Sequence, residues 1–389
     1  MTQAQLVSRP LPGTRAGLPV IDVDTHAGVS YLHLFKYLSQ RWREWLSQVG
    51  MRAGTSVAGQ LPRQRAFAHR LDTVPPNGMP PGSDEEFARE QHLDFYDLTA
   101  AMLNPLSVDL GGWEPAELGR EYQRAVNEQM RDHWLAVDKR WHGAVSVPVE
   151  QPEHAAAEIA RCAGEKADGV QWAHIGLPSR TDRPIGNPRY WPIFEAAEHF
   201  DIPVAFHVGA TRSSQVTACG WPSYYFEDHV GFAQQNFSLV PSMIFEGVFE
   251  RFPKLKVVLI ELGWSWVPAF AWRLDASYRV MHKEVPHLTK LPSEYLQEHF
   301  WYSTQPMEEP EDPRWFDDVL AYCDRFGIGD RLMFSSDYPH WDFDSPQEAV
   351  PASVPHETKA KILAGIASEL YNIPLPSAVG SSPVAESAR

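Results

Sequence analysis

The sequence predicts a single α/β domain built as a closed (β/α)8 barrel, the TIM-barrel architecture, with a helical, Pro/Gly-rich insertion after its first strand. Three observations predict this fold. The chain has 389 residues, which is long for one domain but ordinary for this barrel. About eight short apolar runs are each followed by a helical pattern. Polar residues able to carry chemistry stand where these runs end, as they do at the C-terminal mouth of such a barrel.

The first predicted strand is the β-branched run from Pro19 to Asp24, which ends in acidic residues. After it, we expect an insertion or cap at residues 31–97 to interrupt the alternation of strands and helices. Residues 31–49 are aromatic and apolar at helical spacing, and the Pro/Gly segment at 75–82 predicts a loop. Ser83, followed by three acidic residues, predicts a helix that runs to about Tyr96.

From residue 98 onward, strands and helices alternate regularly. Eight such units favour closure into a barrel, and an open Rossmann-like sheet is disfavoured because residues 24–28 read Asp-Thr-His-Ala-Gly where a GxGxxG turn would stand. We expect residues 1–389 to form one domain with a flexible tail at 375–389. The predicted strands are 98–104, 143–149, 169–175, 202–208, 256–261, 300–303 and 332–335, and the predicted helices are 115–138, 153–166, 191–200, 242–252, 264–281, 312–326 and 357–371.

Composition excludes several classes of protein. Hydrophobic residues make up 43% of the chain and charged residues 22%, so a disordered or fibrous protein is excluded. The net charge of −16 repels phosphate backbones and anionic lipid, so neither nucleic acid nor a membrane is an expected partner. Three cysteines without a CxxC pair, no long apolar run and no secretory signal pattern lead us to expect a soluble cytoplasmic protein.

Carboxylates and imidazoles follow several of the predicted strands. Converging at one barrel mouth, they are the ligands that a divalent ion such as Zn²⁺ or Mn²⁺ takes in proteins. The triplet Asp24-Thr25-His26 places its first and third side chains on one side of an extended backbone, so both are able to reach one ion. The candidates in chain order are Asp22, Asp24, His26, His174, His207, Glu261 and Asp337.

These motifs resemble those of the amidohydrolase superfamily, specifically its amidohydrolase-2 branch. That branch contains aminocarboxymuconate semialdehyde, γ-resorcylate and 5-carboxyvanillate decarboxylases. The resemblance is carried by residues 21–26 (IDVDTH), by His207 at the end of strand five, and by residues 336–339 (SDYP) after strand eight. Residues 251–259 resemble the branch's entry into strand six, and residues 89–105 its segment before strand two.

The resemblance implies a metal ion held by Asp24, His26, His207 and Asp337, with Zn²⁺ as the expected ion and Mn²⁺ as the alternative. Such an ion either activates water or grips a substrate carboxylate and a neighbouring oxygen. The first hypothesis is therefore a metal-dependent decarboxylase of a small aromatic or unsaturated carboxylic acid. The alternative is a metal-dependent hydrolase of an amide, ester or lactone, and a minor alternative is an inactive binding subunit. Relatives are often dimers, so the resemblance also implies a homodimer.

The chain departs from the branch at the end of strand six, where many members carry a His and this sequence has Glu261. In decarboxylating relatives that His is thought to transfer a proton. We therefore expect Glu261 to act as a general acid or base whose pKa is raised by burial, or as an additional metal ligand. His174 is the other candidate proton donor, with a packed structural histidine as its alternative. We expect Asp337 to take part in catalysis as well as in metal binding.

Three further features each allow two interpretations. Asp22 is expected to be buried, orienting the first ligand or hydrogen-bonding the backbone rather than binding the ion directly. His340 either lines the pocket or belongs to an ordinary loop. The aromatic residues Trp42 and Trp45 stand at roughly helical spacing, which marks either a buried helix face or a subunit contact.

Overall fold

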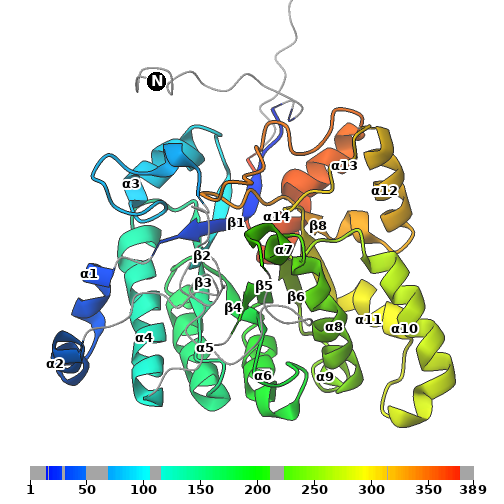
Figure 1. Cartoon of the computed structure of the whole chain (residues 1–389), viewed down its shortest axis with the longest axis horizontal. Coiled ribbons are helices and arrows are strands. Elements are labelled where there is room, and N and C mark those ends of the chain that lie inside the picture. The colour runs from blue at the N-terminus through cyan, green and yellow to red at the C-terminus, as the bar shows by residue number, and fades with distance from the viewer. Residues whose placement is uncertain are drawn as a thin grey trace, which may run out of the picture.

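The computed structural model describes residues 15, 17–28, 31–49, 69–105, 115–210, 223–312 and 314–376. Residues 50–68 of the predicted insertion and residues 377–389 of the predicted tail lie outside the described residues. The described part forms one eight-stranded sheet in the order β1 to β8, surrounded by helices (Figure 1). The predicted fold, a (β/α)8 barrel, is confirmed.

The strands pair in sequence order, and every neighbouring pair from β1 to β8 is parallel. The barrel closes where β1 meets the chain after β8, because Val23 N donates to Phe334 O at 3.0 Å and Thr25 bridges Tyr338. The strands are β1 (Ile21–Ala27), β2 (Ala100–Pro105), β3 (Trp141–Ser146), β4 (Trp172–Arg180), β5 (Val204–Ala210), β6 (Val257–Ile260), β7 (Phe300–Ser303) and β8 (Leu332–Met333).

Helices follow the strands as the alternation predicts, and their apolar faces pack on the outside of the barrel. The predicted helix 242–252 is instead two helices, because Gly247 has a φ of 77° and ends the first of them. The α-helices are α1 (Tyr31–Leu34), α2 (Gln40–Val49), α3 (Glu85–Ala88), α4 (Ala116–Gln129), α5 (Pro152–Ala167), α6 (Trp191–His199), α7 (Tyr225–His229), α8 (Asn236–Phe245), α9 (Val248–Arg251), α10 (Val267–Met281), α11 (Pro292–His299), α12 (Arg314–Asp324), α13 (His356–Ala360) and α14 (Ile366–Tyr371).

Two strands differ from their predicted bounds in ways that affect the site. The predicted strand 332–335 ends at Met333, because the next backbone N–H groups donate to other partners: Phe334 N to Ile362 O, and Ser335 N to the Thr304 hydroxyl. Strand β4 runs to Arg180 rather than ending at Ile175. His174 is therefore its third residue and lies near the beginning of the strand, far from the C-terminal end where the sequence placed it.

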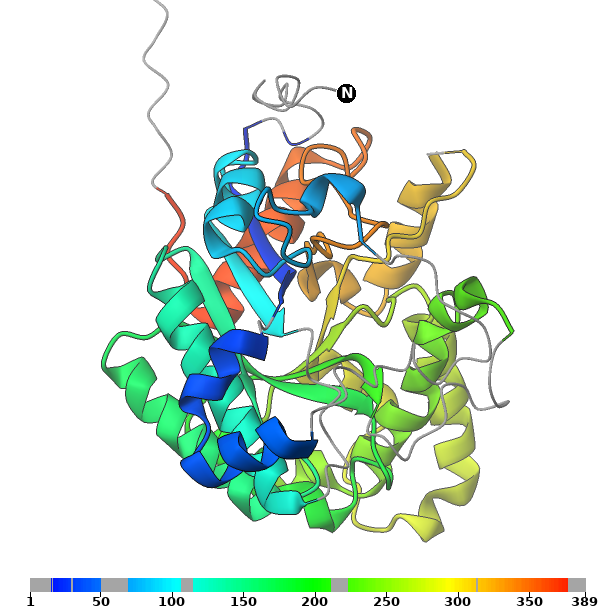
Figure 2. The same cartoon turned by 60° about the vertical axis from the view of Figure 1, so that its left-hand side comes forward.

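The first part of the insertion packs on the outside of the barrel. Helices α1 and α2 lie beside α4 in both views (Figures 1 and 2). Trp42 is only 2% exposed and belongs to a buried cluster with Leu118 and Tyr122 of α4, whereas Trp45 is 39% exposed. The aromatic spacing thus marks a face buried within the chain. Among the described residues, no helix is long and apolar enough to cross a bilayer.

Candidate metal centre

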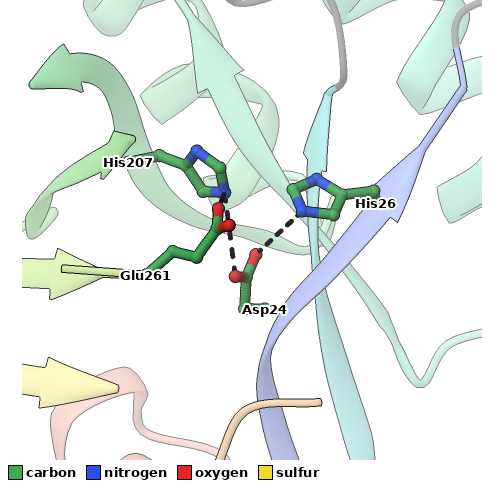
Figure 3. Close-up of side chains that lie close together, drawn as sticks. All are labelled: Asp24, His26, His207 and Glu261. Carbon is green, nitrogen blue, oxygen red and sulfur yellow. Dashed lines mark ion pairs between the residues drawn. The ribbon is translucent and has the colours of Figure 1, made fainter. Parts of the chain in front are cut away.

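Four acidic and imidazole side chains meet at the C-terminal ends of three strands (Figure 3). Asp24 and His26 come from β1, His207 from β5, and Glu261 directly follows β6. Each offers one ligand atom, and these atoms lie within 4.8 Å of one another. All four residues are at most 8% exposed. Two carboxylates and two imidazoles so close together form a donor set that fits a divalent ion.

Two of the separations between donor atoms are too long for direct hydrogen bonds and suit a shared ion. Asp24 Oδ1 lies 3.7 Å from His26 Nε2, and Asp24 Oδ2 lies 3.7 Å from His207 Nε2. Glu261 Oε2 lies 3.1 Å from the same His207 nitrogen. Among the described residues, Asp24 Oδ2 and His207 Nε2 are buried without a hydrogen bond. Such unpartnered polar atoms are costly unless something between them is bound.

Both imidazoles are oriented by a hydrogen bond at the other ring nitrogen. His26 Nδ1 donates to Asn104 O at 3.0 Å, and His207 Nδ1 donates to Val208 O at 2.7 Å. A backbone carbonyl only accepts, so each Nδ1 carries the hydrogen. In the neutral form of each ring, the lone pair of Nε2 therefore faces the cluster, as a metal-binding histidine requires.

Asp337 contacts the same His26 nitrogen that faces Asp24. Its Oδ1 lies 2.8 Å from His26 Nε2 and 2.6 Å from His340 Nδ1. His26, Asp337 and His340 form a second group of possible ligands within 4.8 Å of one another, so His26 is common to both groups. Of the four ligands expected from the sequence, Asp24, His26 and His207 thus lie in the first group with Glu261, whereas Asp337 lies in the second group with His26 and His340.

The backbone is strained at two of these positions. Glu261 and Asp337 both have a φ of 58°, in the left-handed region that costs a residue with a Cβ atom of order 1 kcal/mol or more. Hydrogen bonds hold the strained residues in place: Glu261 N donates to the Ser303 hydroxyl at 3.0 Å, and Asp337 N donates to Asp24 O at 3.0 Å. Strain retained at two adjoining carboxylates is typical of a functional site.

Asp22 links β1 to the turn that carries Asp337. Its Oδ1 accepts from the backbone N–H groups of Asp24 at 3.1 Å and Ser336 at 2.9 Å. Its Oδ2 accepts from the Thr25 hydroxyl at 3.0 Å, from the Ser336 hydroxyl, and lies 2.8 Å from His92 Nε2. With both oxygens occupied by these donors, Asp22 orients the backbone of the neighbouring ligands instead of facing the ion.

The charged groups of the cluster change one another's pKa. Burial opposes ionisation of Asp24, but the His26 and His207 imidazoles outweigh it and lower the pKa of Asp24 to about 2. Burial opposes protonation of His26, yet Asp24 and Asp337 raise its pKa to about 8. Burial raises the pKa of Asp337 to about 7 against the opposing effect of His26. The site without an ion therefore attracts protons to the positions where an ion would supply positive charge.

The structure does not bring His174 into the cluster. This residue is fully buried, and its Nε2 lies 2.8 Å from Asn104 Oδ1. Asn104 in turn donates from Nδ2 to Asp24 Oδ1 at 2.8 Å. Burial lowers the pKa of His174 to about 3. His174 thus reaches Asp24 only through Asn104, a residue that the sequence analysis did not single out although it is the last polar residue of β2.

A second polar network contacts Asp337, and the sequence did not predict it. Gln305 donates from Nε2 to Asp342 Oδ2 at 2.7 Å and to Asp337 Oδ2 at 3.3 Å. Asp342 also lies 2.8 Å from His229 Nε2. Gln305 follows β7, Asp342 lies in the loop after β8, and His229 ends α7. The motif SDYPHWD places Asp342 near the site, but no local pattern indicates its contact with Gln305 or His229.

Comparison with known proteins gives three findings. Residues 21–373 match a family model described as amidohydrolase. γ-Resorcylate decarboxylase from Polaromonas sp. (strain JS666) is 22% identical over 332 residues, which cover 81% of this chain and 99% of the relative. Solved structures also share the fold, and two of them are decarboxylases. 5-Carboxyvanillate decarboxylase from Sphingomonas paucimobilis aligns with a TM-score of 0.68 and 20% identity over 92% of this chain and 100% of that one. Dihydroxybenzoic acid decarboxylase from Polaromonas sp. JS666, with bound manganese and 2-nitroresorcinol, aligns with a TM-score of 0.61 and 15% identity over 92% and 98%.

Proposed function

This chain belongs to the amidohydrolase family, and we propose from that premise that it is a metal-dependent decarboxylase of a small aromatic or unsaturated carboxylic acid. The observation that carries the proposal is the buried meeting of Asp24, His26, His207 and Glu261 at the barrel mouth, with Asp337 beside His26. The decarboxylase activities of the relatives and of the proteins with the same fold support the choice of reaction.

We assign Asp24, His26, His207 and Asp337 as the metal ligands. An ion held by these residues would supply positive charge for a substrate carboxylate and a neighbouring oxygen. The chain itself contributes orientation, because hydrogen bonds from His26 to Asn104 and from His207 to Val208 fix the two imidazoles before any ligand arrives. All four residues are at most 8% exposed, so little water contacts the proposed ligands.

Glu261 is the side chain that we assign to proton transfer. Burial, together with the neighbouring Asp337 carboxylate, raises the pKa of Glu261 against the opposing effect of His207, which favours a proton on this carboxyl group before an ion binds. In the proposed reaction this proton goes to the ring carbon that bears the carboxylate. The bond from that carbon to the carboxylate then breaks, its electron pair restores the unsaturated system, and CO₂ leaves. Glu261 regains a proton from solvent, so one proton is consumed for each CO₂ released.

The test is an assay of the manganese- or zinc-loaded protein with a panel of aromatic acids labelled with ¹³C in the carboxylate. The panel includes 2,6-dihydroxybenzoate, 5-carboxyvanillate and benzoate as an unsubstituted control. Labelled CO₂ together with the ring product that lacks the carboxylate supports a decarboxylase. Turnover confined to amide, ester or lactone compounds, without labelled CO₂, would identify the hydrolase alternative instead.

Metal affinity is expected to depend steeply on pH. In the protein without an ion, the pKa of His26 is raised to about 8 and that of Asp337 to about 7, so both groups carry protons at lower pH. An ion needs both deprotonated and must displace those protons. The dissociation constant should therefore rise by at least about tenfold for each pH unit below 8. Calorimetric titration with Mn²⁺ in buffers of different ionisation enthalpy measures both the affinity and the protons released. A metal affinity that does not change between pH 6 and pH 8 would contradict the assignment of His26 and Asp337 as ligands.

The finer assignments are proposed on less direct grounds. Zn²⁺ remains the expected ion and Mn²⁺ the alternative, which the manganese in the Polaromonas structure supports; metal analysis of the purified protein decides between them. The described residues are proposed to form one domain with 31–97 as its insertion. A cytoplasmic homodimer is proposed by analogy with relatives, and light scattering during gel filtration measures the oligomeric state.

A further inference from the structure

We propose that Tyr371, His174 and Asn104 form a hydrogen-bonded chain that positions Asp24 as a metal ligand from inside the barrel. This inference rests on the proposed metal site and adds to it three positioning residues, none of which would touch the substrate. It also gives His174 a role that differs from proton donation. Asp24 comes from β1, Asn104 from β2, His174 from β4 and Tyr371 from α14, so the chain joins four elements.

The contacts run without a gap from Tyr371 to the cluster. The Tyr371 hydroxyl lies 3.3 Å from His174 Nδ1, and His174 Nε2 lies 2.8 Å from Asn104 Oδ1. Asn104 Nδ2 lies 2.8 Å from Asp24 Oδ1. The other oxygen of Asp24 is the one that lies 3.7 Å from His207 Nε2 and makes no hydrogen bond among the described residues. The hydrogen-bonded chain therefore contacts Oδ1 of Asp24 and leaves Oδ2 of Asp24 free to bind the ion.

The donors and acceptors of this chain have only one consistent arrangement. An ionised carboxylate accepts but never donates, so Asn104 must donate to Asp24 from its amide nitrogen. That leaves Asn104 Oδ1 facing His174, and His174 must donate from Nε2. Because the imidazole is neutral, Nδ1 then accepts, and the Tyr371 hydroxyl donates to it. Every hydrogen in the chain thus points toward Asp24, which favours the ionised form that binds a cation.

Burial of these polar groups costs free energy, which supports a positioning role for them. Asp24 and His174 are fully buried, and Asn104 is 3% exposed. Apolar side chains would fill such positions without the cost of desolvating an imidazole and an amide. Asn104 also fixes His26, since its backbone carbonyl accepts from His26 Nδ1 at 3.0 Å. One residue therefore orients two of the four proposed ligands, and His174 and Tyr371 hold that residue in place.

Tyr371 lies at the opposite end of the barrel from the metal centre. It lines a cavity of about 650 Å³ together with residues that precede strands, among them Thr99, Gln171 and Pro203. Such residues mark the N-terminal end of the strands. The ring is buried in a cluster with Ile366 and Ile373, whereas the hydroxyl points to His174. Removing the hydroxyl therefore breaks the first link of the chain and leaves the packing of the ring intact.

The test compares metal affinity in two variants that each lose a buried phenol oxygen. Tyr371→Phe removes the first donor of the chain. Tyr302→Phe is the matched control, because the Tyr302 hydroxyl is fully buried yet has no hydrogen-bond partner among the described residues. Competition with a chromophoric chelator measures the dissociation constant for Mn²⁺. We expect Tyr371→Phe to weaken Mn²⁺ binding roughly 3- to 10-fold, which is less than the ~10- to 100-fold loss typical for direct partners of a ligand. Tyr302→Phe should leave the Mn²⁺ affinity unchanged.

A second pair of variants tests His174 itself. His174→Gln keeps an amide donor toward Asn104 and should retain most of the affinity, whereas His174→Leu removes the donor and should weaken binding about 10-fold or more. Equal metal affinity in all four variants and in the wild type would contradict the proposed hydrogen-bonded chain. A weaker affinity of Tyr371→Phe would also contradict it if the same substitution lowered the thermal unfolding midpoint of the metal-free protein. Such a result would indicate that the substitution disturbs packing. If instead the wild type binds no ion at these residues, the proposed metal site itself is wrong.

Discussion

Dialysis of the purified protein against a chelator is expected to lower CO₂ release from its aromatic acid substrate by about 10³-fold or more. In the proposed site an ion supplies several kcal/mol of charge stabilisation, and each 1.36 kcal/mol changes a rate tenfold. Without an ion, the carboxylates of Asp24, Glu261 and Asp337 remain buried, at most 5% exposed, and, among the described residues, only the neighbouring imidazoles offset their negative charge. Loss of the positive charge of the ion should weaken binding of a substrate carboxylate, so binding as well as chemistry should suffer.

The control for this prediction is restoration of the ion. Adding back one equivalent of Mn²⁺ or Zn²⁺ should recover the rate, while circular dichroism shows that the metal-free protein keeps its secondary structure. The barrel core does not depend on the ion, because its main apolar cluster packs between the strands and the surrounding helices. Full activity in a protein shown by elemental analysis to hold no metal would contradict the proposal.

Asp337→Asn is expected to lower kcat/KM by about 10²- to 10³-fold, equivalent to a loss of roughly 3–4 kcal/mol of transition-state stabilisation. The substitution removes a negative charge and replaces one oxygen by an amide group beside His26 Nε2 and His340 Nδ1, which lie 2.8 Å and 2.6 Å from Asp337 Oδ1. Asn tolerates the left-handed backbone that Asp337 adopts at φ 58°. The backbone turn should therefore survive, and the loss should be chemical.

Asp275→Asn provides a matched control. Asp275 is 6% exposed in α10 and accepts hydrogen bonds from Ser293 N at 3.0 Å and the Ser293 hydroxyl at 2.8 Å. The same change of a buried carboxylate to an amide there should leave metal content and kcat/KM near the wild-type values. If Asp337→Asn retained wild-type kcat/KM and bound one ion with unchanged affinity, Asp337 would be neither a ligand nor a catalytic group.

The sequence predicts the barrel because its strands and helices are specified locally, by apolar runs and helical periodicity. The carboxylates and imidazoles that end strands one, five, six and eight were also recognisable, since parallel strands bring their C-terminal ends together. His174 was misplaced because Gly176 and Pro178 interrupt the apolar run after it, and both residue types usually mark the end of a strand. The sheet nevertheless continues to Arg180, which leaves His174 deep in the barrel.

Contacts between distant segments account for what the sequence could not predict. Asn104 carries no sign in its own sequence neighbourhood that it will meet Asp24, 80 positions away, or His174, 70 positions away. Gln305 reaches Asp337 and Asp342 only because β7 and β8 are neighbours in the closed sheet. Periodicity and motif spacing determine which residues end a strand, but the detailed register of the closed barrel determines which of those side chains touch.

The central claim is that Asp24, His26, His207 and Asp337 hold one divalent ion. Anomalous X-ray diffraction from crystals of the Mn²⁺-loaded protein, collected on both sides of the manganese absorption edge, tests it most directly. We expect a single strong anomalous peak about 2.0–2.3 Å from one donor atom of each of the four residues. A peak elsewhere in the molecule, or no peak at this mouth when elemental analysis shows bound metal, would contradict the claim.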